Sequence, residues 1–437
     1  MRNVVFIISM LALAACNAGQ DTSESESQST AQTTSPGAAS ATPSVDGAGQ
    51  QTFVASDTGR ESEETRPAES DYEPAFEDQT RAPIPAETEA WTTETLAQGL
   101  EHPWGLDFLP DGTMLITERP GRLRIVAADG EILEPVAGVP NVDARKQGGL
   151  LDVTVAPDFE SSRMILMSFS EPHDDGTNNT AVMRARLSDD LTALENVAVI
   201  FSQYPNVEST GHFGSRVVFQ DEDTIWVTMG DRQGDPVRKN AQDPSNLIGT
   251  VARINTDGSI PEGNPFVGDA EKAPELWSYG HRNIQAAAVH PDTGELWTIE
   301  HGPRGGDELN RPEPGKNYGW PAISYGIEYR GGAVYEGKTE ADGMEQPVYY
   351  WDPVIAPAGA TFYTGEVFPS WQGDLFVGGL RTARVSRLVM EDGRVAAEEW
   401  LDIGHRVRDV VQGPDGLLYL VTDEADGRVM RIIPGNG

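Results

Sequence analysis

The sequence has few of the residues that build covalent cross-links, soft-metal sites and nucleic-acid surfaces. Its 437 residues include one cysteine, which excludes a disulfide framework, an iron–sulfur cluster, a c-type haem and a zinc ribbon. It contains 32 basic and 69 acidic residues. The resulting formal net charge of −37 argues against a nucleic-acid partner, because phosphate binding needs a basic face. No G-x-G-x-x-G motif leads from a strand into a helix, so a nicotinamide site is not supported.

The sequence also lacks an apolar run long enough to cross a bilayer. The run Val4–Leu13 follows the positive charge of Arg2 and is typical of a cleaved signal. Residues 13–16, Leu-Ala-Ala-Cys, resemble the bacterial lipobox, so we predict a lipoprotein signal over 1–16 with a lipidated Cys16. The alternative is an ordinary secretory signal with an incidental cysteine. We expect the mature chain on the periplasmic side or at the cell surface, anchored to a membrane by its lipid.

Residues 17–90 contain almost no aromatic or branched side chains that could form a core. They carry 15 acidic residues against Arg60, Arg66 and Arg81 and are rich in Ser, Thr, Ala, Gly and Gln. Too little apolar surface is available to offset the loss of chain entropy on folding. We therefore predict a disordered acidic linker over 17–90, followed by one folded domain over 91–437.

The folded part shows no long helical period but repeats one hairpin pattern six times. Each copy has an apolar stretch, a turn rich in Pro, Asp and Gly, and then a strand-like alternation. The copies are 105–118, 151–170, 217–231, 286–302, 367–380 and 410–424. Six such units predict an all-β, six-bladed β-propeller of four-stranded antiparallel blades. A pair of β-sandwiches is the alternative, but sandwiches do not repeat one hairpin six times.

Polar motifs cluster at the ends of these predicted strands, where a propeller presents its functional loops. They are Gln147-Gly-Gly, 209–216, 278–283, 300–308, 315–320 and 406–409. Several arginines within an acidic protein indicate an anionic ligand such as a di- or tricarboxylate. A Gly/Pro loop with Glu308 nearby suits a hard cation such as Ca²⁺, and His212 has the pKa range of a general base.

In combination, these motifs resemble those of the soluble quinoprotein aldose sugar dehydrogenases, which use pyrroloquinoline quinone (PQQ). The resemblance runs from about residue 97 to 434, with the motifs in the same order. It implies a six-bladed propeller with PQQ over the channel mouth, bound together with Ca²⁺. It also implies that His212 takes the proton of the anomeric hydroxyl while hydride passes to the quinone.

The resemblance further implies which residues contact the cofactor. Gln147 matches a contact near the reaction centre. Arg282 and Asn283 match the pair on the quinone oxygens, where Arg282 would stabilise developing negative charge. Arg406 and Arg408 match the pair that holds the PQQ carboxylates. Arg381 occupies a position where the family usually has a lysine, so the charge is kept but the geometry of its donors changes.

Two calcium sites are implied in the same way. Gly302 and Pro303 match backbone carbonyl ligands of the cofactor's Ca²⁺. Glu308 and Tyr318 match ligands of a second, structural Ca²⁺. One departure concerns the base: some relatives have an aspartate directly before the catalytic histidine, whereas this chain has Gly211. The group that orients His212 must therefore come from elsewhere in the fold.

Several other residues have a structural and a functional interpretation. Asp231 can line the channel, but a solvated turn is an equally good interpretation. For Arg216 an ion pair between blades is the better interpretation. His281 and His301 are expected to be structural or to support the residues that contact the ligands, since a general base needs only one partner.

These expectations predict oxidation of aldose sugars at C1 to the lactone, with electrons passed to an external acceptor, a quinone or a small redox carrier. The first alternative is a Ca²⁺-dependent sugar lactonase on a six-bladed propeller. That chemistry needs acidic side chains on a central metal and gives no reason for Arg282, Arg381, Arg406 and Arg408 together. The second alternative is a propeller that binds a partner without catalysis.

Overall fold

The computed structural model describes residues 61–435, which contain six antiparallel β-sheets arranged as the blades of a propeller. Blade 1 holds β2 (Pro103–Phe108), β3 (Met114–Glu118) and β4 (Arg122–Val126); blade 2 holds β5 (Leu150–Val155), β6 (Met164–Pro172), β7 (Asn178–Leu187) and β8 (Leu194–Ser202); blade 3 holds β9 (Gly214–Phe219), β10 (Thr224–Met229), β11 (Thr250–Asn255) and β12 (Leu276–Tyr279). Blade 4 holds β13 (Ile284–Val289), β14 (Leu296–Glu300), β15 (Asp307–Asn310) and β16 (Tyr349–Trp351); blade 5 holds β17 (Pro357–Phe362), β18 (Leu375–Gly379), β19 (Arg384–Glu391) and β20 (Arg394–Asp402); blade 6 holds β21 (Val407–Gln412), β22 (Leu418–Thr422), β23 (Gly427–Pro434) and β1 (Trp91–Leu100).

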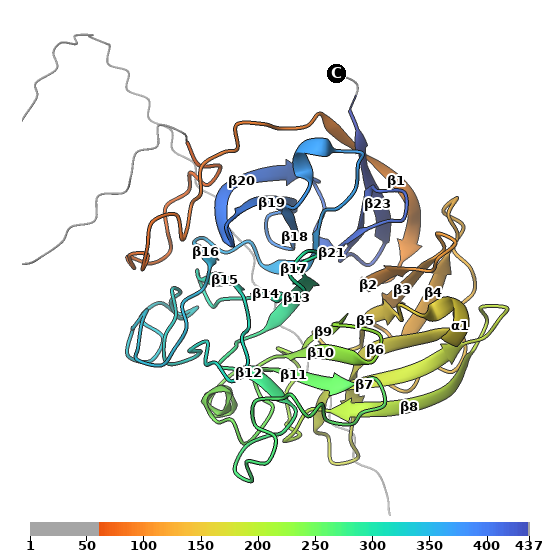
Figure 1. Cartoon of the computed structure of the whole chain (residues 1–437), viewed down its shortest axis with the longest axis horizontal. Coiled ribbons are helices and arrows are strands. Elements are labelled where there is room, and N and C mark those ends of the chain that lie inside the picture. Colours follow the sequence, from red (N-terminus) through yellow and green to blue (C-terminus); the bar gives the residue numbers. More distant parts are fainter. Residues whose placement is uncertain (1–60, 436–437) are drawn as a thin grey trace, which may run out of the picture. The chain divides into compact units, whose positions relative to one another are not determined.

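The first strand of each blade lies at the centre, and these innermost strands contact one another around a ring (Figure 1). Helix is confined to α1 (Phe159–Ser162) and the 3-10 turns η1 (Val237–Gln242) and η2 (Pro369–Trp371) among residues 61–435. None of these helices has the length and apolar character that a membrane crossing requires. The predicted six-bladed propeller is confirmed, and Cys16 with its signal lies outside the described residues.

The ring is closed by pairing the two ends of the folded chain. Strand β1 runs antiparallel to β23, from Trp91 opposite Pro434 to Leu100 opposite Gly427, so the N-terminal strand becomes the outermost strand of blade 6. Blade 1 differs from the predicted four strands because only three are present. Its fourth position is reduced to two isolated bridges near Pro135, a residue that cannot donate a backbone hydrogen bond to a sheet.

The turns that predicted the hairpins have the expected backbone. Gly112 and Gly416 follow the aspartates of two Pro-Asp-Gly turns and adopt φ values of 87° and 78°, which L-residues other than glycine rarely adopt. The amide of Leu109 donates to the carbonyl of Thr113 across the first of these turns. The Asp-Gly signal therefore located the link between the innermost strand and the next one.

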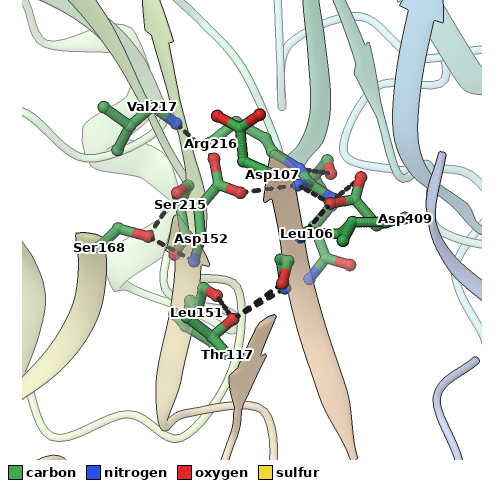
Figure 2. A network of polar contacts seen from close by, with 12 residues as sticks. Leu106, Asp107, Thr117, Leu151, Asp152, Ser168, Ser215, Arg216, Val217 and Asp409 are labelled. Carbon is green, nitrogen blue, oxygen red and sulfur yellow. Dashed lines mark hydrogen bonds and ion pairs between the residues drawn. The ribbon is translucent and has the colours of Figure 1, made fainter. Parts of the chain in front are cut away.

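Three aspartates on the innermost strands, of which Asp152 and Asp409 are buried, tie neighbouring blades together at the hub (Figure 2). Each accepts a hydrogen bond from a backbone amide of the adjacent blade. The pairs are Asp107 with Val155 at 2.7 Å, Asp152 with Val217 at 2.8 Å, and Asp409 with Leu106 at 3.0 Å. Burial raises the pKa of Asp107 to about 6 and also raises the pKa of Asp152.

Arg216 provides the positive charge that this group of carboxylates needs. Its guanidinium lies 2.8 Å from Asp152 and 2.9 Å from Asp409, and it stacks over Trp104 at 4.3 Å from the ring centroid. All three partners are buried. The interpretation of Arg216 as an ion-pair residue between blades is thus confirmed.

Replacing Arg216 by methionine is expected to destabilise the fold by about 3–5 kcal/mol, because two carboxylates would be left buried without their counter-charge. Urea unfolding followed by fluorescence measures this difference. The matched control is Arg186→Met, because Arg186 also pairs with two carboxylates, Asp189 and Glu195, but on the surface. We expect no resolvable change in that variant. Equal effects of the two substitutions would contradict this role of the hub.

The predicted disordered linker is wrong over residues 61–90, which we call the strap. Gln79 and Ala82 are fully buried, and Ala82 joins the hydrophobic cluster between blades 4 and 5. The Gln79 side chain donates to the carbonyl of Pro347, and a bridge pairs Ser62 with Pro83. Composition alone missed this order because the apolar surface that the strap covers belongs to the propeller. The remaining part of the predicted linker, 17–60, lies outside the described residues.

Candidate functional site

One cavity of about 350 Å³ collects six of the residues predicted from the motifs, all from segments at the ends of strands that surround the hub. These are Gln147, His212, Arg282, Asn283, Arg406 and Arg408. Most of them lie just before or at the start of an innermost strand, so one end of the ring presents them together. We call this space the main cavity. Its other lining residues are Trp104, Arg119, Gln285, His301, Tyr329, Ala356, Leu380 and Asp423.

His212 is held by a buried carboxylate that the motifs did not identify as its partner. The Nδ1 atom of His212 lies 2.6 Å from Oδ1 of Asp231, which follows the end of β10 by two residues. The other oxygen of Asp231 accepts a hydrogen bond from Nε1 of Trp320 at 2.7 Å, and Oδ1 also accepts one from the Gln233 amide at 2.8 Å. Asp231 is therefore fixed on both oxygens and is not a solvated turn. It provides the orienting group that Gly211 cannot.

The backbone around His212 is equally constrained. His212 has a φ of 50°, and its amide donates to Oε1 of Gln147 at 2.8 Å. A Cβ atom on Gly230 would lie 2.0 Å from the His212 carbonyl oxygen, so only glycine fits there. Asn283 accepts a hydrogen bond from the amide of Gly214 at 3.1 Å. Gln147 and Asn283 thus both help to hold the His212 segment.

The surroundings favour the neutral form of the His212 imidazole. Burial lowers the pKa of His212, and the positive charge of Arg282 adds to this effect, although Asp231 acts in the opposite direction. With Nδ1 donating to Asp231, the lone pair is on Nε2 and is available to accept a proton. This arrangement suits a general base that works at and below neutral pH.

The arginines of the main cavity are anchored but keep free donors. Arg282 donates to the carbonyls of His301 at 2.8 Å and Gly302 at 2.6 Å. Arg408 donates to Gln285 at 2.8 Å and to Asp423 at 2.6 Å. The buried Nε atoms of Arg282, Arg408 and Arg119 have no hydrogen-bond partner within residues 61–435. Buried donors without acceptors are costly, so this set of arginines favours an anionic ligand.

Charge in the main cavity is strongly positive for so acidic a protein. Four of its lining residues are arginines, and Asp423 is the one carboxylate among the lining residues that the structure describes. Burial opposes ionisation of Asp423, but the guanidinium of Arg408 outweighs it and holds the pKa of Asp423 well below its usual range. Arg406, which is half exposed, donates to the carbonyl of Leu380 at 3.0 Å and faces the same space. Neither Asp423 nor Arg119 was identified from the motifs.

A second cavity of about 320 Å³ adjoins the main one and shares His301, Tyr329 and Ala356 with it. Arg381 lies here and not in the main cavity, together with Gly302 and Pro303. The predicted cofactor contact and the two predicted carbonyl ligands are thus next to the main cavity. In this structure the Gly302 carbonyl already accepts a hydrogen bond from Arg282.

Glu308 and Tyr318 line a narrow space on the other side of Gly302 and Pro303. Burial, together with the neighbouring Glu300 carboxylate, raises the pKa of Glu308 well above its usual range. The Tyr318 hydroxyl donates to the Arg311 carbonyl at 2.5 Å and accepts from the Glu313 amide at 2.9 Å. No group of three His, Cys, Asp or Glu side chains that could hold a metal ion is found between residues 61 and 435. A cation at this place would therefore need backbone oxygens as further ligands.

Comparison with known proteins identifies the family of the chain. Residues 100–431 match the profile of the glucose/sorbosone dehydrogenase family. The chain belongs to this family. The aldose sugar dehydrogenase YliI of Escherichia coli is 45% identical over 351 residues, which cover 78% of this chain and 93% of the relative. The glucose/sorbosone dehydrogenase assignment makes the chain an oxidoreductase that acts on sugars.

Two solved structures support the family at the level of the fold. A glucose dehydrogenase crystal structure is 47% identical, with a TM-score of 0.76, and the match covers 79% of this chain and 100% of that chain. The PQQ-bound aldose sugar dehydrogenase of Streptomyces coelicolor is 27% identical, with a TM-score of 0.65, and the match covers 80% and 99%. In this glucose/sorbosone dehydrogenase family member, the strap precedes the residues that the profile matches.

Proposed function

We propose that the chain oxidises aldose sugars at C1 to the lactone and depends on PQQ and Ca²⁺. The observation that carries this proposal is the main cavity, where His212, backed by Asp231, faces the same space as buried arginine donors that have no acceptor among residues 61–435. A sugar hydroxyl needs a base within hydrogen-bond reach, and an acidic redox ring needs fixed cations. The cavity supplies both.

The lining residues fit the tricarboxylate PQQ. Arg406, Arg408 and Arg381 would hold its carboxylates, while Arg282, Asn283 and Gln147 would contact the ring near His212. PQQ, when bound, supplies the acceptor for the two electrons removed from the sugar. The PQQ-bound relative from Streptomyces coelicolor supports this choice of cofactor. The orphaned Nε atoms of Arg282 and Arg408 supply the structural reason.

For the cation we propose the carbonyls of Gly302 and Pro303, which border both the second cavity and the narrow space near Glu308. Carbonyl and carboxylate oxygens are the ligands that Ca²⁺ prefers. We also propose a structural Ca²⁺ at Glu308 and Tyr318. The pair of nearby carboxylates, Glu300 and Glu308, supports it, since a cation would offset their repulsion.

His212 performs the proton transfer in this proposal. Its Nε2 atom accepts the proton of the C1 hydroxyl, and the Asp231 carboxylate stabilises the imidazolium that forms. Trp320 and the Gln233 amide keep Asp231 in place, so the imidazole is oriented before substrate arrives. Arg282, anchored on two carbonyls, provides a fixed positive charge next to the reacting groups.

A propeller lactonase is the second candidate, and one observation weighs against it. A metal-dependent hydrolase of this kind needs acidic side chains around a central metal, whereas the main cavity is lined by four arginines and Asp423. Hydrolysis of a lactone with no redox acceptor present would favour the lactonase over the dehydrogenase.

Reconstitution of the purified apoprotein tests the proposed activity. We expect sugar-dependent reduction of an electron-accepting dye only after both PQQ and Ca²⁺ have been added, because the arginines and carbonyls hold the two together. Omission of either component serves as the control. Equal dye reduction without PQQ would contradict the proposal.

The membrane anchor and the external electron acceptor are inferred from the sequence alone. We propose a lipid anchor at Cys16, which would place the propeller outside the cytoplasm, and a quinone or small redox carrier as the external acceptor. The lipobox-like residues 13–16 support the anchor. Its test is the distribution of a Cys16→Ser variant between membrane and soluble fractions, where a membrane-bound variant would contradict it.

A further inference from the structure

The strap reaches the site, although it precedes the residues that define the family. The family profile begins at residue 100, whereas the strap spans 61–90. Glu69, in the middle of the strap, lines the second cavity together with Gly302, Pro303 and Arg381. A segment outside the family profile thus forms part of the wall beside the proposed cofactor and cation contacts.

An ion pair connects Glu69 to the loop that carries these carbonyls. Loop 302–306 links β14 to β15, and within it Arg304 donates from Nε to Oε2 of Glu69 at 2.6 Å and also pairs through Nη2. The Glu69 side chain is 19% exposed, so the pair is partly shielded from water. Arg304 is also fixed through its backbone, which pairs with Ile327 in both directions. Glu69 therefore contacts the loop through the Arg304 side chain, while Ile327 pairs with the Arg304 backbone.

Asp352 provides a second connection between the strap and the same loop. Its buried carboxylate accepts hydrogen bonds from the amides of Glu69 at 2.8 Å and Ser70 at 3.1 Å, and from the Ser70 hydroxyl at 2.8 Å. Within the part of the chain that the structure describes, all hydrogen bonds to this carboxylate come from the strap. A Cβ on Gly305, whose φ is 83°, would lie 2.8 Å from Asp352 Oδ1, so the loop packs directly on this carboxylate.

Further contacts fix the strap on both sides of Glu69. The Arg81 guanidinium donates to the carbonyl of Asp352 and also to those of Glu64 and Arg66, which closes the strap on itself. Further along, the amide of Ala82 donates to the Tyr349 hydroxyl at 3.0 Å. The position of Glu69 is therefore determined by the propeller and is not that of a free chain end.

We propose that the strap is a functional part of the site, in which Glu69 positions loop 302–306 and closes the second cavity on the side of Gly302 and Pro303. This inference rests on the proposed PQQ and Ca²⁺ binding and adds a segment to it. Glu69 acts through Arg304 and is a positioning residue. The strap slows the release of the bound cofactor, because ligand exit on this side requires the Glu69–Arg304 pair to separate.

The test compares two isosteric substitutions in the strap. Glu69→Gln removes the pair with Arg304, while the matched control Glu64→Gln removes a pair with Arg66 that does not touch the cavity. PQQ binding to the apoprotein in Ca²⁺ is followed by quenching of tryptophan fluorescence, since Trp104 lines the main cavity. We expect Glu69→Gln to raise the Kd and the release rate about fivefold with an unchanged melting temperature, and Glu64→Gln to change neither.

A double-mutant cycle separates positioning from general loosening. Combining Glu69→Gln with Arg304→Gln should weaken PQQ binding no further than either single substitution, because both remove the same pair. Additive losses, or equal losses in Glu69→Gln and Glu64→Gln, would overturn the inference. If the unaltered protein binds no PQQ, the proposed function fails. If it binds PQQ and Glu69→Gln binds equally well, the inference about the strap alone fails.

Discussion

The His212→Ala variant is expected to lose about two to four orders of magnitude in kcat while it still binds PQQ, because the variant lacks the base that accepts the hydroxyl proton. Dye reduction by the reconstituted enzyme measures kcat, and fluorescence quenching measures PQQ affinity. His212 sits at a φ of 50°, where alanine is less favourable than asparagine. His212→Asn is therefore the second variant, and it should lose as much activity with less effect on the loop.

The control for His212 is His290→Ala. His290 packs against Phe362, with the ring centroids 4.8 Å apart, and does not line the main cavity. We expect its replacement to leave kcat unchanged. A His212 variant with full turnover would remove this residue from the proposed role, whatever the affinity for PQQ.

The pH dependence of the unaltered enzyme should reflect the same group. A base must be neutral, so activity is present above the pKa of His212 and is lost as the pH falls through it. Burial lowers that pKa from its ordinary value of 6.5. The acid limb of the kcat/KM profile should therefore lie below pH 6.5.

Asp231→Asn is expected to cost about two to four orders of magnitude in kcat. The asparagine can present its amide group to Nδ1 of His212, which favours the tautomer that carries its proton on Nε2. That tautomer has no lone pair facing the substrate. Moreover, a neutral side chain cannot stabilise the imidazolium as a carboxylate does.

The measurement for Asp231 combines kcat with its pH profile, which a purely structural defect would not shift in a defined direction. Loss of the carboxylate should lower the pKa of His212 further, because Asp231 is the neighbour that raises it. Asp221→Asn is the control, since Asp221 only caps an exposed turn at Thr224. Equal kcat values for Asp231→Asn and the unaltered enzyme would show that His212 needs no carboxylate.

Much of the fold could be predicted because each blade carries its own local signal. The Pro-Asp-Gly turns at Gly112 and Gly416 lie between apolar stretches and need no distant contact to form. The pairing of β1 with β23 was not predicted, since its partners are more than 300 residues apart and neither strand has a signal for the other. The strap was missed for the same reason. The strap is ordered because it packs on apolar surface of blades 4 and 5, and the composition of the strap contains no information about that surface.

The site was predicted as far as motifs around strand ends could locate it. Six residues converge on the main cavity, and Arg381, Gly302 and Pro303 lie in the adjoining one. Asp231 was left undecided because its partner, Trp320, comes from another blade. Gly230, directly before Asp231, is the one sequence feature that marks this position, because the close approach of the His212 carbonyl requires a glycine there. That requirement becomes visible only when the distance between Gly230 and His212 is known.

In the proposed account, the positive main cavity in a chain of net charge −37 lets one face select an anionic ring. Carboxylates elsewhere would repel the anion, while the arginines around His212 would attract it and hold it in one orientation. The hub is in direct contact with the main cavity. Arg216 donates to the Arg408 carbonyl and stacks on Trp104, and both Arg408 and Trp104 line the cavity. The stability of the hub and the geometry of the site are thus linked by shared residues.

A crystal structure of the protein with PQQ and Ca²⁺ tests the central claim most directly. The proposed account predicts a planar ring whose carboxylates contact Arg406 and Arg408, with Arg282 and His212 beside it. The buried Nε donors should then have acceptors. A ring bound elsewhere on the propeller, or clear density in the main cavity that leaves these arginines without contacts, would contradict it.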